Sequence, residues 1–280
     1  MTDGVAVPPV ARLLVWRHGR TEWNASGRFQ GQLDPPLDDE GRAQAARTAP
    51  HLAELLAGQE TVVVSSDLVR ARDTAGALAP LLGVGVQVDE RLREHGLGSW
   101  EGLTRDEVAA RHPEQYADWM AGRPVRGRGG ESPDAVAQRA LAAVAGLPPV
   151  DVAVLVTHGG TAGRLVEALL GLGVDHRRVF GPLGNCHWSE LNVQGTRWRL
   201  MRHNTSVPRP GVVPAPVGAQ EAARRSGADD DGTPPQAGAS PEEGAAAVPP
   251  NGAGTAPREG AEPPRRDGAG PAPEDADAAL

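Results

Sequence analysis

Two short apolar runs in this sequence each lead to a histidine that is followed by a glycine. One run, residues 13–16, leads through Arg17 to His18, and the other, residues 152–157, leads to His158. An apolar run without alternation is typical of a parallel strand buried on both faces. Because open α/β sheets bind ligands at the carboxyl ends of their strands, we expect these two histidines, about 140 residues apart, to share one site.

Strand-like and helix-like patterns alternate along most of the chain. Short apolar runs are separated by segments in which apolar residues recur about every 3.6 positions, one of them behind a helix cap at Asp38. This alternation predicts an α/β fold with a mostly parallel central sheet and helices on both faces. The expected strands are residues 13–16, 61–64, 87–88, 153–157, 188–192 and 197–201. The expected helices are residues 38–56, 71–82, 104–111, 114–120, 133–147 and 162–170.

The end of the chain differs sharply in composition from the rest. Residues 207–280 contain 14 Pro, 11 Gly and 18 Ala, residue types that cannot build a packed core, and they show no helical or strand period. Low hydrophobicity combined with many Pro and Gly is typical of disorder. We therefore expect one α/β domain over residues 1–206 and a disordered tail over residues 207–280.

Charge and cysteine content exclude several classes of protein. Residues 1–206 carry 24 acidic residues against 22 Arg, so we expect no nucleic-acid partner. The single Cys186 and the spacing of the remaining histidines predict no disulfide, no metal site and no cofactor. No apolar run approaches the length of a membrane span, and residues 1–11 lack the pattern of a signal peptide, which favours a cytoplasmic protein without a membrane partner. A homodimer is one of the oligomeric states that the sequence leaves open.

Arg17, His18 and Gly19 together suit the transfer of a phosphoryl group. A phosphate monoester is largely dianionic near neutral pH, since its second pKa is about 6. Arginine offers a planar fork of donors that matches two phosphate oxygens. A neutral imidazole can attack phosphorus and form a phosphohistidine that water later cleaves, and Gly19 would let the backbone approach the oxygens closely. The triplet therefore predicts a site for a phosphomonoester.

Further candidate residues come from three other segments. Arg70 follows the second expected strand at the start of a helix, where the helix amino terminus adds positive partial charge. His158 can donate a hydrogen bond to the phosphoryl oxygens as charge builds up. Glu94, in a glycine-rich loop, is a candidate proton donor for the leaving alkoxide, because a bound dianion raises the pKa of a nearby carboxyl group. Glu101 and Glu131 are alternative acids for that role.

Several ordered motifs resemble those of the histidine phosphatase superfamily, in its phosphoglycerate-mutase-like branch. The resemblance covers residues 12–206 and none of the tail. It implies a phosphoglycerate-mutase-like fold with one catalytic domain, and a metal-independent phosphomonoester hydrolase that works through a phosphohistidine. The motifs are the segment 14–24, Ser-Ser-Asp-Leu-x-Arg-Ala-x-x-Thr-Ala at 65–75, the loop around Glu94, Gly-Gly-Glu-Ser at 129–132 and His-Gly-Gly at 158–160.

The resemblance also implies a role for each matching position. Three residues would be catalytic, and four more would bind the phosphate of the substrate. The catalytic residues are His18 as the nucleophile, Glu94 as the proton donor, and His158. The substrate-binding residues are Arg17, Asn24, Arg70 and Gly159.

Two departures from the family's mutases favour a hydrolase. Those mutases carry Glu-Ser after the first Arg-His-Gly, whereas this chain has Arg20 and Thr21, and only about 30 residues separate Gly102 from Pro133, where mutases carry a longer insertion. The closing segment, residues 184–204, resembles glucosyl-3-phosphoglycerate phosphatases of high-G+C bacteria. The expected substrate is therefore a small phosphorylated metabolite such as a phosphoglycerate or a sugar derivative, with glucosyl-3-phosphoglycerate as a candidate. A phosphoglycerate mutase and a non-catalytic phosphate-binding domain of the same fold are the alternatives.

Overall fold

The structure, a computed structural model, describes residues 9–173, 176 and 179–208. The tail expected over residues 207–280 lies outside the described residues except for Val207 and Pro208, so the domain boundary at 206 stays a prediction. None of the described helices is long and apolar enough to cross a membrane.

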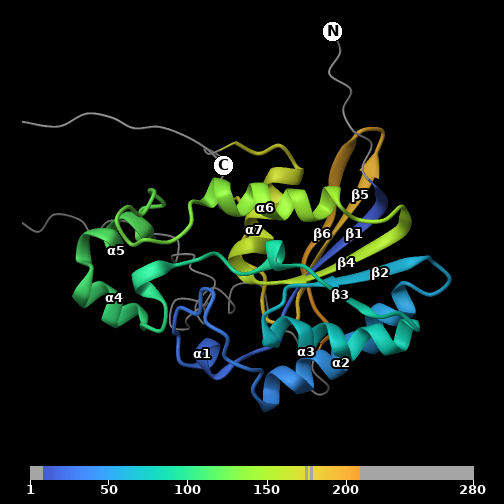
Figure 1. The fold of residues 1–280 in the computed structure, drawn as a ribbon, viewed down its shortest axis with the longest axis horizontal. Helices are drawn as coiled ribbons and strands as arrows, with labels where there is room; N and C mark the ends of the chain where they lie inside the picture. The colour runs from blue at the N-terminus through green and yellow to red at the C-terminus, as the bar shows by residue number, and fades with distance from the viewer. Residues whose placement is uncertain (1–8, 174–175, 177–178, 209–280) are drawn as a thin grey trace, which may run out of the picture. The chain divides into compact units, whose positions relative to one another are not determined.

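One six-stranded sheet forms the middle of the described part of the chain (Figure 1). Its strands are β1 (Val10–Arg17), β2 (Thr61–Ser65), β3 (Val86–Val88), β4 (Val150–Thr157), β5 (Trp188–Gln194) and β6 (Arg197–Thr205). Their order across the sheet is β3-β2-β4-β1-β5-β6. The first four strands in that order pair in parallel, while β5 pairs antiparallel with both β1 and β6. The expectation of a mostly parallel α/β sheet is confirmed.

Helices cover both faces of this sheet, as the alternating pattern predicted. The helices are α1 (Glu22–Ala25), α2 (Asp39–Leu55), α3 (Val69–Leu78), α4 (Arg105–Arg111), α5 (Pro113–Met120), α6 (Pro133–Ala145) and α7 (Gly159–Leu169). Short 3₁₀ helices within the described residues include η1 (Ala79–Leu82), η2 (Glu90–Leu92) and η3 (Gly98–Trp100). In Figure 1, α6 and α7 lie on one face of the sheet and α2 and α3 on the other, while α1, α4 and α5 lie beyond one end of it.

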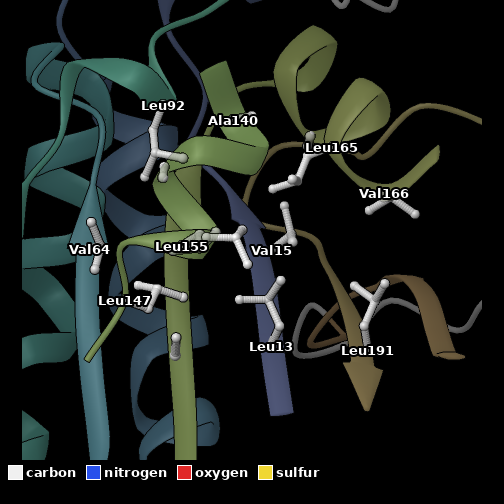
Figure 2. Close-up of a cluster of buried hydrophobic side chains, with 14 of the residues drawn as sticks. Leu13, Val15, Val64, Leu92, Ala140, Leu147, Leu155, Leu165, Val166 and Leu191 are labelled. Atoms are coloured by element: carbon white, nitrogen blue, oxygen red, sulfur yellow. The ribbon is translucent and has the colours of Figure 1, made fainter. Parts of the chain in front are cut away.

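Successive side chains of the central strands enter two separate hydrophobic clusters. This burial on both faces explains why the sequences of these strands are unbroken apolar runs. Each fully buried aliphatic side chain contributes about 1.5–3 kcal/mol to the free energy of folding. The cluster under α6 and α7 includes Leu13, Val15, Leu155, Leu165 and Val166 (Figure 2). The cluster under α2 and α3 includes Leu14, Trp16, Val154, Leu52 and Leu78.

A third, aromatic cluster supports residues 104–130, a segment that we call the lid. It contains Phe29, Leu97, Trp100, Val108 and Trp119, all buried. The ring of Trp119 meets those of Trp100 and Phe29 edge to face, with centroids 6.1 and 5.6 Å apart. The lid therefore has a small core of its own, away from the sheet.

The register of the strands brings the two His-Gly pairs to one edge of the sheet. Arg17, the last residue of β1, pairs with Thr157, the last residue of β4. Ser65, the last residue of β2, pairs with Val156. The residues that follow these three strands therefore emerge side by side, as the sequence predicted for the histidines.

The helix boundaries follow the capping residues of the sequence. The Asp38 side chain accepts a hydrogen bond from the N–H of Gly41 at 2.7 Å and caps α2, as expected. The helix expected over residues 71–82 differs, because its last part is the 3₁₀ helix η1. Pro80 has no N–H to donate, so the hydrogen-bond pattern of the α-helix is interrupted at this position. Gly83, with a φ of 68°, then ends the segment in the left-handed region.

Candidate active site

His18 follows β1 and is fixed at the sheet edge through its main chain. Its N–H donates to the carbonyl oxygen of Thr157 at 3.0 Å. Its own carbonyl oxygen accepts from the N–H of Cys186 at 3.1 Å and from the side-chain amide of Asn185 at 3.2 Å. The residue is buried. Strand β4 and the loop before β5 thus hold His18 from two sides.

The ring of His18 is in the form that a nucleophile needs. Nδ1 lies 2.7 Å from the carbonyl oxygen of Gly19, which can only accept, so Nδ1 carries the hydrogen and Nε2 presents a lone pair. Burial, followed by the positive charges of Arg70 and Arg17, holds the pKa of His18 well below the ordinary 6.5, although the hydrogen bond to Gly19 opposes this shift. The ring is therefore neutral near neutral pH.

Two buried arginines supply the positive charge beside that ring. Arg17 donates from Nη1 to the carbonyl oxygen of Leu183 at 2.5 Å, and Arg70 donates to two main-chain carbonyl oxygens at 2.7 and 2.9 Å. Carbonyl groups orient both guanidinium groups without cancelling their charge. The carboxylate of Asp34 lies 3.7 Å from Arg70, but it is 46% exposed, and water screens such a pair.

His158 follows β4 and packs against His18, with ring centroids 5.0 Å apart. Its Nε2 lies 2.9 Å from Oγ of Ser66, which accepts from the N–H of Leu68 at 3.3 Å and can donate its own hydrogen to that nitrogen. Nδ1 then carries the hydrogen of the ring, and this buried atom has no hydrogen-bond partner among the described residues. Burial, followed by the charge of Arg70, holds the pKa of His158 well below its ordinary value. A neutral N–H without a partner matches an acceptor such as a phosphoryl oxygen.

Glu94 lies at the amino terminus of α7, with hydrogen-bond donors around its carboxyl group. Oε1 accepts from the N–H groups of His95 and Thr161 at 2.7 and 2.9 Å, and Oε2 accepts from the N–H of Gly160 at 3.1 Å. Arg139 of α6 donates to the main-chain carbonyl oxygen of Glu94 at 2.9 Å. The acid is therefore fixed in position next to the His158 turn, as proton transfer requires.

The structure favours Glu94 over the two alternative acids as the proton donor. Glu131 forms an ion pair with Arg139 at 2.7 Å. Burial raises the pKa of Glu131, but the hydrogen bonds from Arg139 and from a backbone N–H outweigh burial and lower it. Glu101 accepts from two backbone N–H groups at 2.8 and 3.2 Å and braces the loop before the lid. Within the described residues Glu94 forms no ion pair, unlike Glu131, and its carboxyl group contacts Gly160 and Thr161 next to His158, unlike that of Glu101. Glu94 is therefore the better placed proton donor.

Asn24 and Gly159 lie next to residues of the site, Asn24 through Asn185 and Gly159 directly after His158. The Asn24 side-chain oxygen accepts from the N–H of Thr21 at 3.0 Å and from Nδ2 of Asn185 at 3.1 Å. An amide oxygen repels an anion, so contact between Asn24 and a phosphate has to come through its Nδ2. Gly159 is buried and begins α7 directly after His158, which places the positive end of that helix dipole beside the site.

Two glycines allow the close approaches on which this geometry depends. A Cβ atom on Gly19 would lie 2.4 Å from the carbonyl oxygen of Gly41, and one on Gly160 would lie 2.8 Å from Oε1 of Glu94. A side chain at either position would therefore displace the loop of the nucleophile or the acid.

A cavity of about 300 Å³ adjoins the site between the lid and the start of α7. Its wall includes Trp119 and Arg128 of the lid together with His95, Gly159 and Gly160. The nucleophile candidate and the two arginines beside it do not line this cavity. The cavity is therefore a neighbour of the phosphate site, with room for the remainder of a substrate.

These groups define a class of enzyme. A neutral buried histidine with an accessible lone pair, two oriented arginines, a second neutral histidine and a fixed carboxyl group are the parts of phosphoryl transfer through histidine. Among the residues that the structure describes, no group of three or more His, Cys, Asp or Glu side chains could hold a metal ion.

Comparison with known proteins gives the family. The model of the histidine phosphatase superfamily (branch 1) matches residues 13–206. Glucosyl-3-phosphoglycerate phosphatase of Mycolicibacterium vanbaalenii is 44% identical over 71% of this chain and 96% of its own. A solved structure of a mycobacterial glucosyl-3-phosphoglycerate phosphatase with VO3 is 38% identical, with a TM-score of 0.63 over 70% of this chain and all of that one. A protein named probable phosphoglycerate mutase of Erwinia tasmaniensis is 36% identical over 65% of this chain and 85% of its own.

The chain belongs to the histidine phosphatase superfamily, and it is a phosphatase. The predicted family, fold class and enzyme class are thereby confirmed. The roles of the individual site residues stay predictions, although the structure gathers all seven of them around the carboxyl ends of β1, β2 and β4 and the lid-facing start of α7.

Several supporting residues were not recognised in the sequence. Thr74 accepts from the N–H of Gly19 at 3.0 Å, and Thr161 donates its hydroxyl hydrogen to the carbonyl oxygen of Arg93 at 2.7 Å. Ser66 and Asn185 contact the two histidines, as described above. Ser66 and Thr74 both lie inside the motif that contains Arg70. Ser66 directly follows β2, so a hydroxyl after a strand end is a signal that could identify it, whereas Thr74 lies within α3 and has no such signal.

Proposed function

We propose that this protein hydrolyses a small phosphomonoester without a metal ion, with His18 as the nucleophile. The observation that carries this proposal is the hydrogen bond between Nδ1 of His18 and the carbonyl oxygen of Gly19 in a buried, neutral ring. It leaves the Nε2 lone pair beside the charges of Arg17 and Arg70. A neutral nucleophile next to fixed positive charge is what attack on a phosphate dianion requires.

In the first step, the bond between Nε2 of His18 and phosphorus forms while the ester bond from phosphorus to the leaving oxygen breaks. Arg17 and Arg70 hold the phosphoryl oxygens, and Nδ1 of His158 donates a hydrogen bond to one of them. Glu94 in its protonated form gives its proton to the leaving oxygen, so the alcohol departs neutral. The products of this step are phosphohistidine and an alcohol.

In the second step, a water molecule takes the place of the alcohol. The Glu94 carboxylate accepts a proton from the water as its oxygen bonds to phosphorus, and the bond from phosphorus to Nε2 breaks. Inorganic phosphate leaves, and both His18 and Glu94 return to their starting forms. The sum of the two steps is ester plus water giving alcohol plus phosphate.

We propose glucosyl-3-phosphoglycerate as the leading substrate candidate. Relatives of that name share 39–44% identity with this chain over 70–71% of its length. The cavity beside Glu94 offers room for a leaving group larger than water. We further propose that the enzyme works in the cytoplasm on a free metabolite and needs no nucleic acid or membrane, while a homodimer stays one of its open oligomeric states.

The experiment that tests this proposal is release of inorganic phosphate in the presence of EDTA. Purified protein is assayed against p-nitrophenyl phosphate, 3-phosphoglycerate, glucosyl-3-phosphoglycerate and a panel of sugar and nucleoside monophosphates. We expect hydrolysis to persist in EDTA and glucosyl-3-phosphoglycerate to give the highest kcat/KM of the panel. Loss of all activity in EDTA, with recovery on adding a divalent metal, would contradict the metal-independent mechanism.

The second candidate function is a phosphoglycerate mutase. The similarity to the protein named as such in Erwinia tasmaniensis favours it. A mutase returns the phosphoryl group from histidine to the other hydroxyl of glycerate, so it must keep water out of the site. Interconversion of 3-phosphoglycerate and 2-phosphoglycerate faster than phosphate release would establish this alternative, and no turnover of any ester would favour a non-catalytic phosphate-binding domain.

A further inference from the structure

Arg128, in the lid, is a buried cation without an ionic partner. It is only 8% exposed, and no carboxylate within the described residues forms an ion pair with it. Its Nη2 lies 2.9 Å from Nε2 of His95, and its guanidinium group lies over the ring of Trp100, 5.4 Å from the centroid. Its Nε is buried and has no hydrogen-bond partner among the described residues.

This state distinguishes Arg128 from the other arginines around the same cavity. Arg123 pairs with Asp118 at 2.8 Å, and Arg164 pairs with Glu167 at 3.1 Å. Arg126 has its side chain exposed to solvent, where water satisfies it. Arg128 alone among these four combines burial with the absence of an anionic partner.

An unpaired buried charge costs free energy. Burial lowers the pKa of Arg128, and the charge of Glu101 offsets this only in part, which shows that the site disfavours the cation. A guanidinium group stays protonated even so. Proteins accept such a cost mainly where a ligand supplies the missing charge.

The position of Arg128 relative to Glu94 indicates which part of a substrate it meets. Nucleophile and leaving oxygen lie on opposite sides of phosphorus in an in-line displacement, so the acid marks the leaving side. His95 follows Glu94, contacts Arg128, and lines the cavity. The leaving alcohol therefore extends into this cavity, toward Arg128.

We propose that Arg128 binds a carboxylate on the leaving group of the substrate. The guanidinium fork matches a carboxylate in two parallel hydrogen bonds, and one unpaired cation balances one negative charge. A second phosphate dianion would need more charge than the cavity offers, because the partly buried Arg164 is already paired with Glu167. The proposal rests on the proposed function, and it makes the substrate class a phosphorylated hydroxy acid.

A matched pair of substrates tests this proposal. 3-Phosphoglycerate carries a carboxylate where glycerol 3-phosphate carries an uncharged hydroxymethyl group. We expect wild-type kcat/KM to be at least about 30-fold higher for 3-phosphoglycerate, as for a buried charge pair. Arg128→Gln should remove that preference and leave kcat/KM for glycerol 3-phosphate within about threefold of wild type. Arg128→Lys keeps the charge but loses the planar fork of donors, so its preference for 3-phosphoglycerate should lie between those of wild type and Arg128→Gln.

The matched control is Arg126→Gln, which removes the same charge two residues away from an exposed position. Its preference for 3-phosphoglycerate should stay within about threefold of wild type, because water screens an exposed charge. Equal wild-type kcat/KM for the two substrates would overturn the proposal even if Arg128→Gln fails to fold. So would retention of the preference in a folded Arg128→Gln protein. Failure of the proposed function is distinguishable, since neither ester would then be hydrolysed by a His18-dependent reaction.

Discussion

The phosphate site and the cavity beside it are built in opposite ways. The phosphate site lies at the ends of buried strands, where main-chain groups such as those of Thr157 and Leu183 hold His18 and Arg17. The cavity lies under the lid, whose two short helices pack on an aromatic cluster of their own. Its loop over residues 121–124 is exposed. The reacting groups are therefore fixed by the sheet, and the surroundings of the leaving group by a separate, smaller core.

This difference has a consequence for mutants of the enzyme. A change in the phosphate site should slow all phosphomonoesters by the same factor, because every substrate presents the same phosphoryl group. A change next to the cavity should slow some substrates more than others. Glu94 lies at the border, since its carboxyl group contacts the start of α7 while its neighbour His95 lines the cavity.

The largest effect is expected from His18→Ala. Without the nucleophile, turnover should fall by at least about 10⁴-fold for p-nitrophenyl phosphate and 3-phosphoglycerate alike. Phosphate release in EDTA measures both. His51→Ala, at an exposed position on α2, is the control and should stay near wild type. A His18→Ala protein that retained a tenth of the activity on either substrate would refute the assigned nucleophile.

Glu94→Gln should slow different substrates to different extents, depending on how much the leaving group needs a proton. Loss of a general acid costs about 10²- to 10⁴-fold, and an alkoxide needs a proton far more than p-nitrophenolate does. The kcat/KM for 3-phosphoglycerate should therefore fall much further than that for p-nitrophenyl phosphate, since kcat/KM covers the steps up to alcohol release. Glu54→Gln, which makes the same change at an exposed position on α2, is the control and should leave both substrates near wild type. An equal loss in Glu94→Gln would mean that Glu94 positions the phosphate instead.

Arg70→Gln should slow all substrates by about 10²- to 10³-fold and change the pH dependence. The Arg70 charge is the second largest cause, after burial, of the lowered pKa of His18. Because His18 reacts in its neutral form, activity is lost as the pH falls through that lowered pKa, well below 6.5 in the wild type. Removing Arg70 raises the pKa of His18 and moves this acidic limb to higher pH.

The pH profiles of wild type and Arg70→Gln are measured with the same substrate, so that the titration of the substrate phosphate affects both profiles equally. Arg72→Gln is the control, since Arg72 lies exposed on the same helix and should leave the profile unchanged. An acidic limb that stays in place in Arg70→Gln would contradict the electrostatic coupling to His18.

Thr74→Val tests how the sheet edge fixes the phosphate site. Thr74 accepts from the N–H of Gly19 at 3.0 Å and donates to the carbonyl oxygen of Arg70 at 2.8 Å. Valine keeps the shape but leaves buried polar groups without partners, so unfolding by urea should show a loss of about 1–3 kcal/mol. Thr61→Val, at the partly exposed start of β2, should cost less than about 0.5 kcal/mol. Equal losses in the two variants would contradict a special role for Thr74.

The smallest effect is expected from removal of residues 209–280. Val207 packs against the cluster under α2 and α3, so the cut is made after Pro208. The sequence of the removed part shows no apolar period that a domain could bury, and kcat/KM should stay within about twofold. A larger loss, or a drop of several degrees in Tm, would show that the boundary expected at 206 is wrong.

The phosphate site could be predicted because strand ends are readable in the sequence. Unbroken apolar runs located His18, Arg70 and His158 at one edge, and the observed register confirms that placement of the strands. In a parallel sheet the carboxyl ends of the strands lie at the same edge, so the strand assignments were sufficient to place these three residues together.

The surroundings of the leaving group could not be predicted in the same way. The choice among Glu94, Glu101 and Glu131 depends on Arg139, whose contact with Glu131 at 2.7 Å belongs to a fold in which α6 crosses the acid loop. The burial of Arg128 depends likewise on aromatic side chains that are distant in sequence. Such contacts leave no hydrophobic period and no capping residue in the local sequence, so the sequence does not predict them.

The measurement that tests the account most directly is the position of the phosphoryl group on the trapped enzyme intermediate. Glu94→Gln protein is mixed with p-nitrophenyl phosphate, whose leaving group needs no proton, and quenched in base before water cleaves the adduct. Nδ1 of His18 is held by the Gly19 carbonyl oxygen, so we predict a base-stable, acid-labile phosphoryl group on Nε2 of His18, identified by mass spectrometry and ³¹P NMR. A phosphoryl group on Nδ1, on His158, or on a serine or aspartate would contradict the account.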